Sequence, residues 1–344
     1  MYVKNIKNKK YLKNNKVLFP TEVFINSKNK STAANAGNLK KIKYVDKSKK
    51  KHRGVILTTY KNFKIIDCLA CKFIHAIPFI DKVDLENFYK KKFYKQNRKK
   101  NYFKNQEKDK LWWEKIFKER IKSFEKVLHK KGTILDVGCG PGFFLSYAKN
   151  RGWKTYGIEP SQTAVDFANK KLGLKVTTGN LNLLKKFKNI DVIYTHGVLE
   201  HLENPIEFLN LAKKSLSKNG IIFTSVANDF NQIQYAALSA AKKPWWIMPP
   251  EHYNYFNISS IQNLMKKRFK IIDTKVSFPV DFFILMGLNY VKYKNLGKKI
   301  HEMRVAFETN LDEGGLSNLK EELQNSFANL KVGRQIDIIC QNKK

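Results

Sequence analysis

Cysteine is scarce in this chain of 344 residues, with only four, at positions 68, 71, 139 and 340. So few cysteines exclude the disulfide framework of small secreted proteins and fit a reducing cytoplasm. A long apolar run is also missing, because the stretch 278–291 contains Asp281 and Asn289 and is too short to cross a bilayer. The basic N-terminus lacks an apolar core of signal-peptide length. We therefore expect a cytoplasmic protein without a membrane span.

Acidic side chains and arginine are scarce as well. The 29 Asp and Glu residues face 66 Lys and Arg residues, and the formal net charge of +37 would normally indicate a phosphate-rich partner. Only seven of the basic residues are arginine, the side chain whose bidentate fork favours phosphate and base recognition. The lysine excess accompanies abundant Asn, Ile, Phe and Tyr, as A/T-rich codons produce. More than half of the net positive charge lies in residues 1–131, so an anionic contact there stays an open alternative.

Three stretches of different composition divide the chain. Residues 1–50 are rich in Lys, Asn and Ser and predict a basic, poorly ordered segment. Residues 51–105 predict a small ribbon-like element and a linker, and residues 106–344 predict the main domain. Elements predicted ahead of the alternating region are strands at 17–25, 55–60 and 63–66 and helices at 84–94 and 108–130.

From residue 133 onward, strand-like and helix-like segments alternate, which predicts an α/β fold with a mainly parallel sheet. The predicted strands cover 133–137, 154–158, 174–177, 190–194, 220–226, 270–276 and 335–340. The predicted helices cover 142–151, 161–171, 204–217, 258–267 and 315–329. Seven strands, the last close to the C-terminus, indicate a Rossmann-like sheet with helices on both faces and a small N-terminal extension.

The most informative motif follows the first of these strands. Residues 134–142 are Ile-Leu-Asp-Val-Gly-Cys-Gly-Pro-Gly, and Glu159 closes the second strand. Glycines let the backbone turn tightly, so a ligand can lie directly against main-chain N–H groups. Such a loop with an acid after the next strand predicts a cofactor whose ribose hydroxyls the carboxylate binds. A purely structural strand, turn and helix is the alternative.

The spacing of the glycines separates two cofactor classes. Nicotinamide dinucleotides favour G-x-G-x-x-G, where the third glycine lets helix and strand approach at the pyrophosphate. Here the run is G-x-G-x-G, and Phe143 occupies the third dinucleotide position. Because no pyrophosphate needs binding, S-adenosylmethionine is the better fit.

Three segments carry a resemblance to class I S-adenosylmethionine-dependent methyltransferases: 134–144, 157–161 (Gly-Ile-Glu-Pro-Ser) and 198–205 (Val-Leu-Glu-His-Leu-Glu-Asn-Pro). Segments 243–256 and 333–339 resemble a bacterial and archaeal subgroup linked to surface-polysaccharide or small-metabolite modification. The resemblance implies that the family's first motif, which holds the amino-acid end of the cofactor, consists of Asp136, Gly138, Cys139, Gly140 and Gly142. It implies that Glu159 is the acid that binds the ribose, and that Asn180 and Leu181, where the family more often has Asp, flank the adenine. Thr195 and His196 correspond to the segment whose backbone closes over the methionine portion.

Methyl transfer is an in-line displacement in which the protein mainly holds the nucleophile in place. A hydroxyl acceptor gains from a general base, and His201 and His252 are the candidates near the carboxyl ends of strands. A histidine bonded to backbone at a helix start is the alternative for His201. An insertion near 228–256 carries the aromatic residues Trp245, Trp246, Tyr253, Tyr255 and Phe256. They predict a lid over the acceptor, with a packed core as the alternative.

The pair Cys68-Leu-Ala-Cys71 resembles half of a zinc ribbon, which in related methyltransferases contains two such pairs. The other pair is missing, and only His52 and His75 are nearby substitutes. We therefore expect a degenerate ribbon held by apolar residues, with no metal, and zinc binding by Cys68 and Cys71 is the less favoured alternative.

The leading hypothesis is a methyltransferase that transfers the methyl group of S-adenosylmethionine to a small-molecule or carbohydrate-like acceptor, with O-methylation as the first choice. An RNA methyltransferase whose basic N-terminal region contacts phosphates is less favoured, and a non-catalytic cofactor-binding scaffold is a third alternative. The sequence leaves the acceptor, the methylated atom and the oligomeric state open.

Overall fold

The computed structural model describes residues 40–46, 48–79, 109–293 and 295–343. By compactness the chain divides into two units built from interleaved segments. The first unit comprises residues 1–79, 227–263 and 275–336, and the second comprises 80–226, 264–274 and 337–344. The strand predicted at 17–25 and the helix predicted at 84–94 lie outside the described residues.

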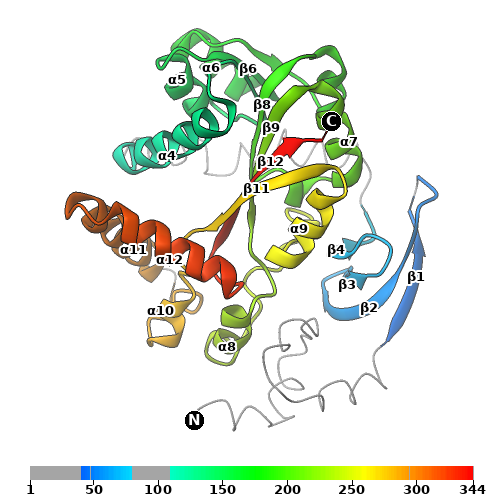
Figure 1. Cartoon of the computed structure of the whole chain (residues 1–344). Coiled ribbons are helices and arrows are strands. Elements are labelled where there is room, and N and C mark those ends of the chain that lie inside the picture. The colour runs from blue at the N-terminus through cyan, green and yellow to red at the C-terminus, as the bar shows by residue number, and fades with distance from the viewer. Residues whose placement is uncertain (1–39, 47, 80–108, 294, 344) are drawn as a thin grey trace. The chain divides into compact units, whose positions relative to one another are not determined.

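A seven-stranded sheet forms the centre of the second unit, in the order β11-β12-β9-β8-β5-β6-β7 (Figure 1). The strands are β5 Thr133–Val137, β6 Lys154–Glu159, β7 Val176–Thr178, β8 Ile190–His196, β9 Leu216–Ala227, β11 Phe269–Val276 and β12 Gln335–Asn342. The pairs β5–β6, β6–β7, β5–β8 and β8–β9 are parallel. The predicted α/β class and Rossmann-like, mostly parallel sheet are therefore confirmed.

Helices follow the strands as the alternating pattern predicted. They are α4 Lys110–Leu128, α5 Phe143–Lys149, α6 Gln162–Leu172, α7 Pro205–Ser215 and α9 Ile258–Lys266. The Ser161 side chain accepts a hydrogen bond from the amide of Ala164 and so caps α6, which ends at Gly173 in the left-handed conformation. Asn204 caps α7 through the amide of Glu207. In Figure 1, α4 and α5 lie on one side of β8 and β9, and α7 lies on the other.

The core of the second unit is rich in aromatic side chains. Phe144 and Tyr194 stack with ring centroids 3.8 Å apart, and Tyr194 stacks on Phe223 at 4.9 Å. Phe124 of α4 is fully buried and contacts the edge of the Phe223 ring. Burial of each such side chain contributes roughly 1.5–3 kcal/mol. The helix at 110–128 is therefore part of this core.

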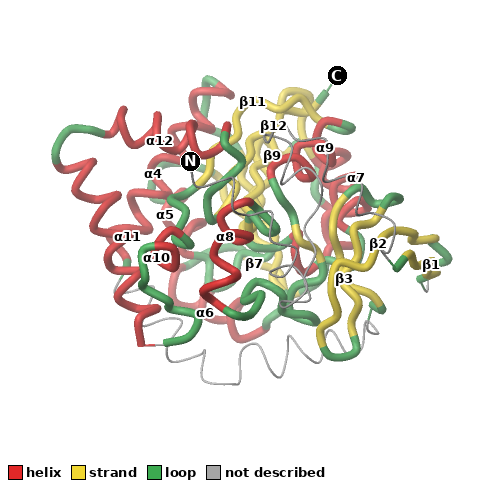
Figure 2. Tube along the Cα trace, turned by 90° about the horizontal axis from the view of Figure 1, so that it is seen from below, coloured by secondary structure: helices red, strands yellow, loops and turns green. Residues whose placement is uncertain are grey.

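The first unit contains a five-stranded sheet in the order β1-β2-β3-β4-β10. Its strands are β1 Lys41–Val45, β2 Lys51–Tyr60, β3 Phe63–Cys68, β4 Phe73–Ile77 and β10 Asn254–Tyr255. Neighbouring strands pair antiparallel, and both views show β1, β2 and β3 side by side (Figure 2). The prediction of poor order across residues 1–50 is wrong at β1. Ile42 and Tyr44 alternate with exposed lysines there, and pairing with β2 stabilises a strand that composition did not reveal.

The described helices that lie wholly in the first unit are α8 Gln232–Ala241, α10 Phe282–Leu285, α11 Asn295–Glu313 and α12 Ser317–Asn329. Only α12 was predicted. Helices α11 and α12 pack as a hairpin, with Phe278 contacting Phe307 of α11 and Phe327 of α12. Among the described helices, none combines the length and the apolar character that a membrane crossing requires.

Candidate functional site

The loop between β5 and α5 has a backbone that only glycine adopts readily. Gly138, Gly140 and Gly142 have φ values of 76°, 52° and 81°. A Cβ atom on Gly142 would lie 2.5 Å from Cδ1 of Leu174, and one on Gly138 would lie 2.7 Å from Cγ2 of Val198. The backbone conformation therefore favours glycine at these two positions, and an added methyl group would also have to displace a neighbouring side chain.

Glu159 ends β6 beside this loop, and its side chain is buried. One carboxylate oxygen accepts a hydrogen bond from the Gly140 amide at 2.9 Å, and the other accepts from the Ser161 amide at 2.9 Å. The two amide contacts fix the orientation of the Glu159 carboxylate beside the glycine loop.

Asp136 of β5 adds a second buried carboxyl to the site. Burial raises the pKa of Asp136 well above its usual range, and the charge of Glu159 raises it further, while Arg120 opposes the shift. Burial and these same two carboxyls also raise the pKa of the Cys139 thiol well above its usual range. Cys139 is therefore a neutral thiol. The two buried carboxyls make the surroundings of the loop favourable for a positively charged group.

The remaining predicted cofactor residues follow β7 and end β8. Asn180 accepts a hydrogen bond from the Asn182 amide at 3.0 Å and caps the short 3-10 helix Leu181–Lys186. Thr195 is fully buried, and its hydroxyl donates to the Phe223 carbonyl inside the sheet at 3.3 Å. The Thr195 side chain is therefore used inside the sheet, and its role in covering the cofactor stays a prediction.

Behind the end of β8, Arg120 joins a polar network that sequence reasoning missed. Its guanidinium donates to Asp337 at 2.9 and 3.1 Å and to the Tyr194 hydroxyl, and it lies 3.3 Å from Nδ1 of His196. Asp337 also accepts from the Ser225 hydroxyl. No local pattern could have revealed this network, because 217 residues separate Arg120 from Asp337.

His196 is held neutral by these neighbours. Burial lowers the pKa of His196 to about 3, and the adjacent positive charge of Arg120 contributes. Because Arg120 can only donate, Nδ1 of His196 must accept, and the ring proton then resides on Nε2. The edge of this ring also meets Trp113 of α4, with the ring centroids 5.8 Å apart. His196 is thus a neutral, oriented hydrogen-bond donor at the carboxyl end of β8.

The two candidate bases lie in different units, so each is described alone. His201 ends a short 3-10 helix, Leu199–His201, and its amide donates to the Val198 carbonyl at 3.0 Å. The carbonyl of His252 accepts from the Tyr255 hydroxyl at 3.0 Å, and its amide donates to Met248. These backbone contacts leave the catalytic roles of both side chains as predictions.

The aromatic residues around His252 are mostly inside the first unit. The side chains of Trp246, Tyr253, Tyr255 and Phe256 are each 2% exposed or less. Phe230 meets the rings of Trp246 and Tyr255 edge to face. This burial favours the packed core over the predicted lid.

Cys68 and Cys71 lie together with both histidines that the sequence offered as substitutes for a second cysteine pair. His52, Cys68, Cys71 and His75 place one ligand atom each within 4.8 Å of the others. The prediction of a metal-free ribbon stays untested, but the geometry brings together a complete set of four donor groups.

Comparison with known proteins places this geometry in context. Residues 106–269 match the family described as "Methyltransferase domain". The ubiquinone biosynthesis O-methyltransferase of Pelagibacter ubique is 31% identical over 121 residues, which is 33% of this chain and 50% of that protein. The tRNA U34 carboxymethyltransferase of Pseudoalteromonas translucida is 31% identical over 98 residues, covering 26% of this chain and 30% of that protein. The chain thus spans about half the length of the first of these relatives.

A solved structure is similar at low sequence identity. The plantazolicin methyltransferase BpumL, determined with a monoazolic desmethylPZN analog and SAH, aligns with a TM-score of 0.47 at 18% identity, covering 76% of this chain and 94% of that chain. The glycine loop and Glu159 lie within residues 106–269, whereas β11 begins at the last residue of this range and β12 lies outside it. This stretch of the chain is therefore similar to the methyltransferase-domain family.

Proposed function

We propose that the chain is a methyltransferase that uses S-adenosylmethionine to methylate a hydroxyl group of a small-molecule or carbohydrate-like acceptor. The observation that carries this proposal is the hydrogen bond between the Glu159 carboxylate and the amide of Gly140. This bond ties the acid after the second strand to the glycine loop after the first. The two parts of the predicted cofactor site are thereby held in one rigid arrangement.

Charge at the loop supports this choice of cofactor. Asp136 and Glu159 are both buried, and their mutual repulsion contributes to the raised pKa of Asp136. A ligand that brings positive groups, such as the ammonium and the sulfonium of S-adenosylmethionine, relieves that repulsion and favours the ionised form of both carboxyls. A dinucleotide would bring a pyrophosphate into the same acidic surroundings, which is electrostatically unfavourable.

When bound, S-adenosylmethionine supplies a methyl group that the sulfonium has already made electrophilic. The protein then needs to hold the cofactor, position the acceptor oxygen and receive its proton. Glu159 binds the ribose, the glycine loop receives the amino-acid end, and Asn180 and Leu181 flank the adenine. Among the candidate bases, His201 lies in the second unit together with these residues.

Similarity to a ubiquinone biosynthesis O-methyltransferase supports a small acceptor with a hydroxyl group. The alignment covers only half of that relative, so the acceptor is proposed by class and not by identity. The local similarity to a tRNA-modifying enzyme and the positive charge of residues 1–131 support RNA as the second candidate acceptor.

Labelling of cell extract tests the proposal. The full chain is incubated with extract and radiolabelled S-adenosylmethionine, and the labelled products are separated by size before and after ribonuclease treatment. We expect label in small organic-soluble or sugar-containing products and none in RNA. Label in ribonuclease-sensitive material would replace the small acceptor with RNA, and cofactor binding without any labelled product would indicate a scaffold.

Calorimetry with S-adenosylhomocysteine tests the site itself. Changing Glu159 to Gln keeps the size of the side chain but removes the charge from its hydrogen bonds, and affinity should fall about tenfold or more. Glu302→Ala on the exposed surface of α11 is the control and should leave affinity unchanged. Equal affinity of the Glu159 variant and the parent protein would refute the ribose assignment.

A further inference from the structure

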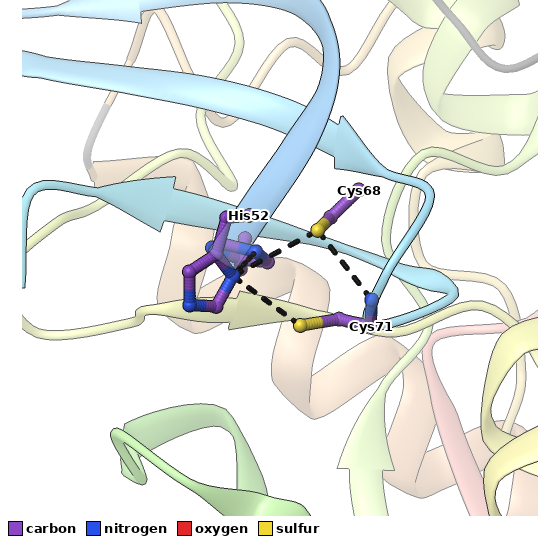
Figure 3. Close-up of side chains that lie close together, drawn as sticks. His52, Cys68 and Cys71 are labelled. Carbon is purple, nitrogen blue, oxygen red and sulfur yellow. Dashed lines mark hydrogen bonds between the residues drawn. The ribbon is translucent and has the colours of Figure 1, made fainter. Parts of the chain in front are cut away.

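Four side chains of the first unit converge on one point of the five-stranded sheet, and Figure 3 shows three of them, His52, Cys68 and Cys71. His52 comes from β2, Cys68 from the end of β3, Cys71 from the following turn and His75 from β4. Their donor atoms lie within 4.8 Å of one another, and all four residues are buried, with exposures of 5% or less. Cys68, Cys71 and His75 are close in sequence, whereas His52 is 16 residues before Cys68. The antiparallel pairing of β2 with β3 brings His52 next to the turn that carries the cysteines.

Hydrogen bonds outside the cluster determine which ring nitrogens carry protons. Nε2 of His52 lies 3.0 Å from a carboxylate oxygen of Asp46, and Nδ1 of His75 lies 3.2 Å from the Ala76 carbonyl. Both partners accept, so these two nitrogens are the donors of their rings. The opposite nitrogens, Nδ1 of His52 and Nε2 of His75, then present lone pairs to each other at 3.2 Å. Two facing lone pairs repel, unless a cation lies between them.

The turn that carries the cysteines is shaped to present two sulfur atoms. The Cys71 amide donates to Sγ of Cys68 at 3.4 Å, and the Lys72 amide donates to the Cys68 carbonyl at 2.8 Å. Lys72 has a φ of 65°, which closes the turn through the left-handed region. Sγ of Cys71 and Sγ of Cys68 lie 3.5 and 3.8 Å from Nδ1 of His52. An amide that donates to sulfur stabilises the thiolate, the form that binds metal.

We infer that His52, Cys68, Cys71 and His75 bind one zinc ion. Two thiolates and two imidazoles form the donor set that tetrahedral zinc prefers. Binding releases the two thiol protons, and two thiolates with two neutral imidazoles then balance the charge of Zn²⁺ inside the protein. Four protein ligands leave no position for water, so the ion is structural and takes no part in methyl transfer.

Asp46 completes the site as an outer partner of a ligand. Its carboxylate also accepts from the Lys50 amide at 2.8 Å and from the Ser48 hydroxyl at 2.7 Å. The turn between β1 and β2 therefore orients the acid, and the acid orients the ring of His52. A carboxylate in this position raises the basicity of a zinc-bound histidine and fixes its tautomer.

The ion would also stabilise the segment that carries one candidate base. His75 on β4 pairs directly with Asn254 on β10, and β10 begins two residues after His252. Holding β4 to β2 and β3 through the metal thus limits the movement of the His252 segment. The inference itself stands on the four ligands and is independent of the proposed acceptor.

Metal analysis of the full chain tests the inference. Protein produced in zinc-supplemented medium and purified under reducing conditions should contain one zinc per chain by mass spectrometry of the metal. Exchange with Co²⁺ should give the intense visible bands of tetrahedral cobalt together with a thiolate-to-cobalt charge-transfer band. Protein without stoichiometric metal and without this cobalt spectrum would overturn the inference, as would a Cys68–Cys71 disulfide in the reduced preparation.

Two variants assign the site to these residues. Cys71→Ser should lose the bound zinc, whereas Cys340→Ser, which alters a buried cysteine of β12, should retain it. Asp46→Asn keeps all four ligands, and zinc affinity in a chelator titration should fall about tenfold to a hundredfold. Because Asp46→Asn removes no ligand, it remains informative if Cys71→Ser fails to fold. Unchanged zinc content in Cys71→Ser, or unchanged affinity in Asp46→Asn, would contradict the assignment.

Discussion

At the scale of single residues, Arg120 shows how one side chain can connect distant parts of the chain. It extends from α4, donates to Asp337 on β12 and Tyr194 on β8, and lies 4.8 Å from the ring centre of Phe223 on β9. Arg120 is buried, and loss of its guanidinium removes the 2.9 Å ion pair with Asp337, whose side chain is partly exposed. The residue therefore matters for stability and for the orientation of His196.

Changing Arg120 to Gln should lower the free energy of unfolding by about 1.5–3 kcal/mol, the contribution of hydrogen bonds to charged groups. Denaturant unfolding monitored by tryptophan fluorescence measures the change. Arg151→Gln provides the matched control, because Arg151 is exposed and its main contact is the Tyr147 ring. We expect a change of less than about 1 kcal/mol for that control. Equal effects of the two substitutions would show that the network is energetically unimportant.

His196 should remain neutral between pH 5 and 8, because burial and Arg120 lower its pKa to about 3. Nitrogen-15 NMR of the labelled ring should show a proton on Nε2 throughout this range. The sign for stability follows from the same shift. Above pH 6.5, His196 is unprotonated in both the folded and the unfolded chain. Between pH 6.5 and 3, His196 binds a proton in the unfolded chain but stays neutral in the folded chain. The contribution of His196 thus reduces stability as the pH falls from about 6.5 to 3, and a ring that titrates near 6.5 would contradict the assignment.

How far the sequence predicts this site depends on the distance between its parts. The glycine loop and Glu159 lie on consecutive strands, and their chemistry could be inferred from residue type and spacing alone. Arg120 and Asp337 meet only because the sheet brings β12 beside β9. The set of His52, Cys68, Cys71 and His75 lies between these cases, since all members were noticed but their convergence depends on strand pairing.

At the scale of elements, the sequence predicted a helix or strand correctly when the segment carries its own apolar pattern. Helix α4 was predicted because its buried residues recur at helical spacing. Helix α11 was not, because Ile300 is its only fully buried residue among the described positions. Strand β1 is also mostly exposed, and its pairing with β2 replaces the apolar signal. Elements stabilised by neighbours rather than by their own burial are therefore the ones that sequence patterns miss.

The turn from β5 into α5 provides a prediction with an internal control. Gly142→Ala should destabilise the chain and weaken cofactor binding, because φ is 81° and the new methyl group would lie 2.5 Å from Leu174. Gly173→Ala places the same methyl group at a φ of 59°, but its nearest neighbour is the Lys149 ammonium at 3.7 Å. The control should lose about 1–2 kcal/mol from the left-handed backbone alone. Thermal unfolding and calorimetry with S-adenosylhomocysteine should both show a larger loss at Gly142, and equal losses would mean that the packing contact is unimportant.

At the scale of the whole molecule, the net charge of +37 predicts non-specific attraction to polyanions. Affinity for an unstructured RNA should fall steeply as salt rises, with a slope of about −0.7 in log K against log salt for each phosphate contact. Removing residues 1–39, which are rich in lysine, should reduce this slope. Fluorescence anisotropy at several salt concentrations provides the measurement. Tight binding that persists at high salt and depends on sequence would instead favour the RNA methyltransferase alternative.

The position of β12 in the sheet has a consequence for how the protein can be divided. This strand lies between β9 and β11, although it is the last strand in the chain. A shortened gene that encodes only the stretch matched by the methyltransferase family, residues 106–269, would end at the first residue of β11 and omit β12 altogether. In the product, β9 would be an edge strand, because the edge that pairs with β12 would have no partner. An exposed hydrophobic edge strand promotes aggregation. The stretch that matches the family is therefore shorter than the stretch needed to form the complete seven-stranded sheet.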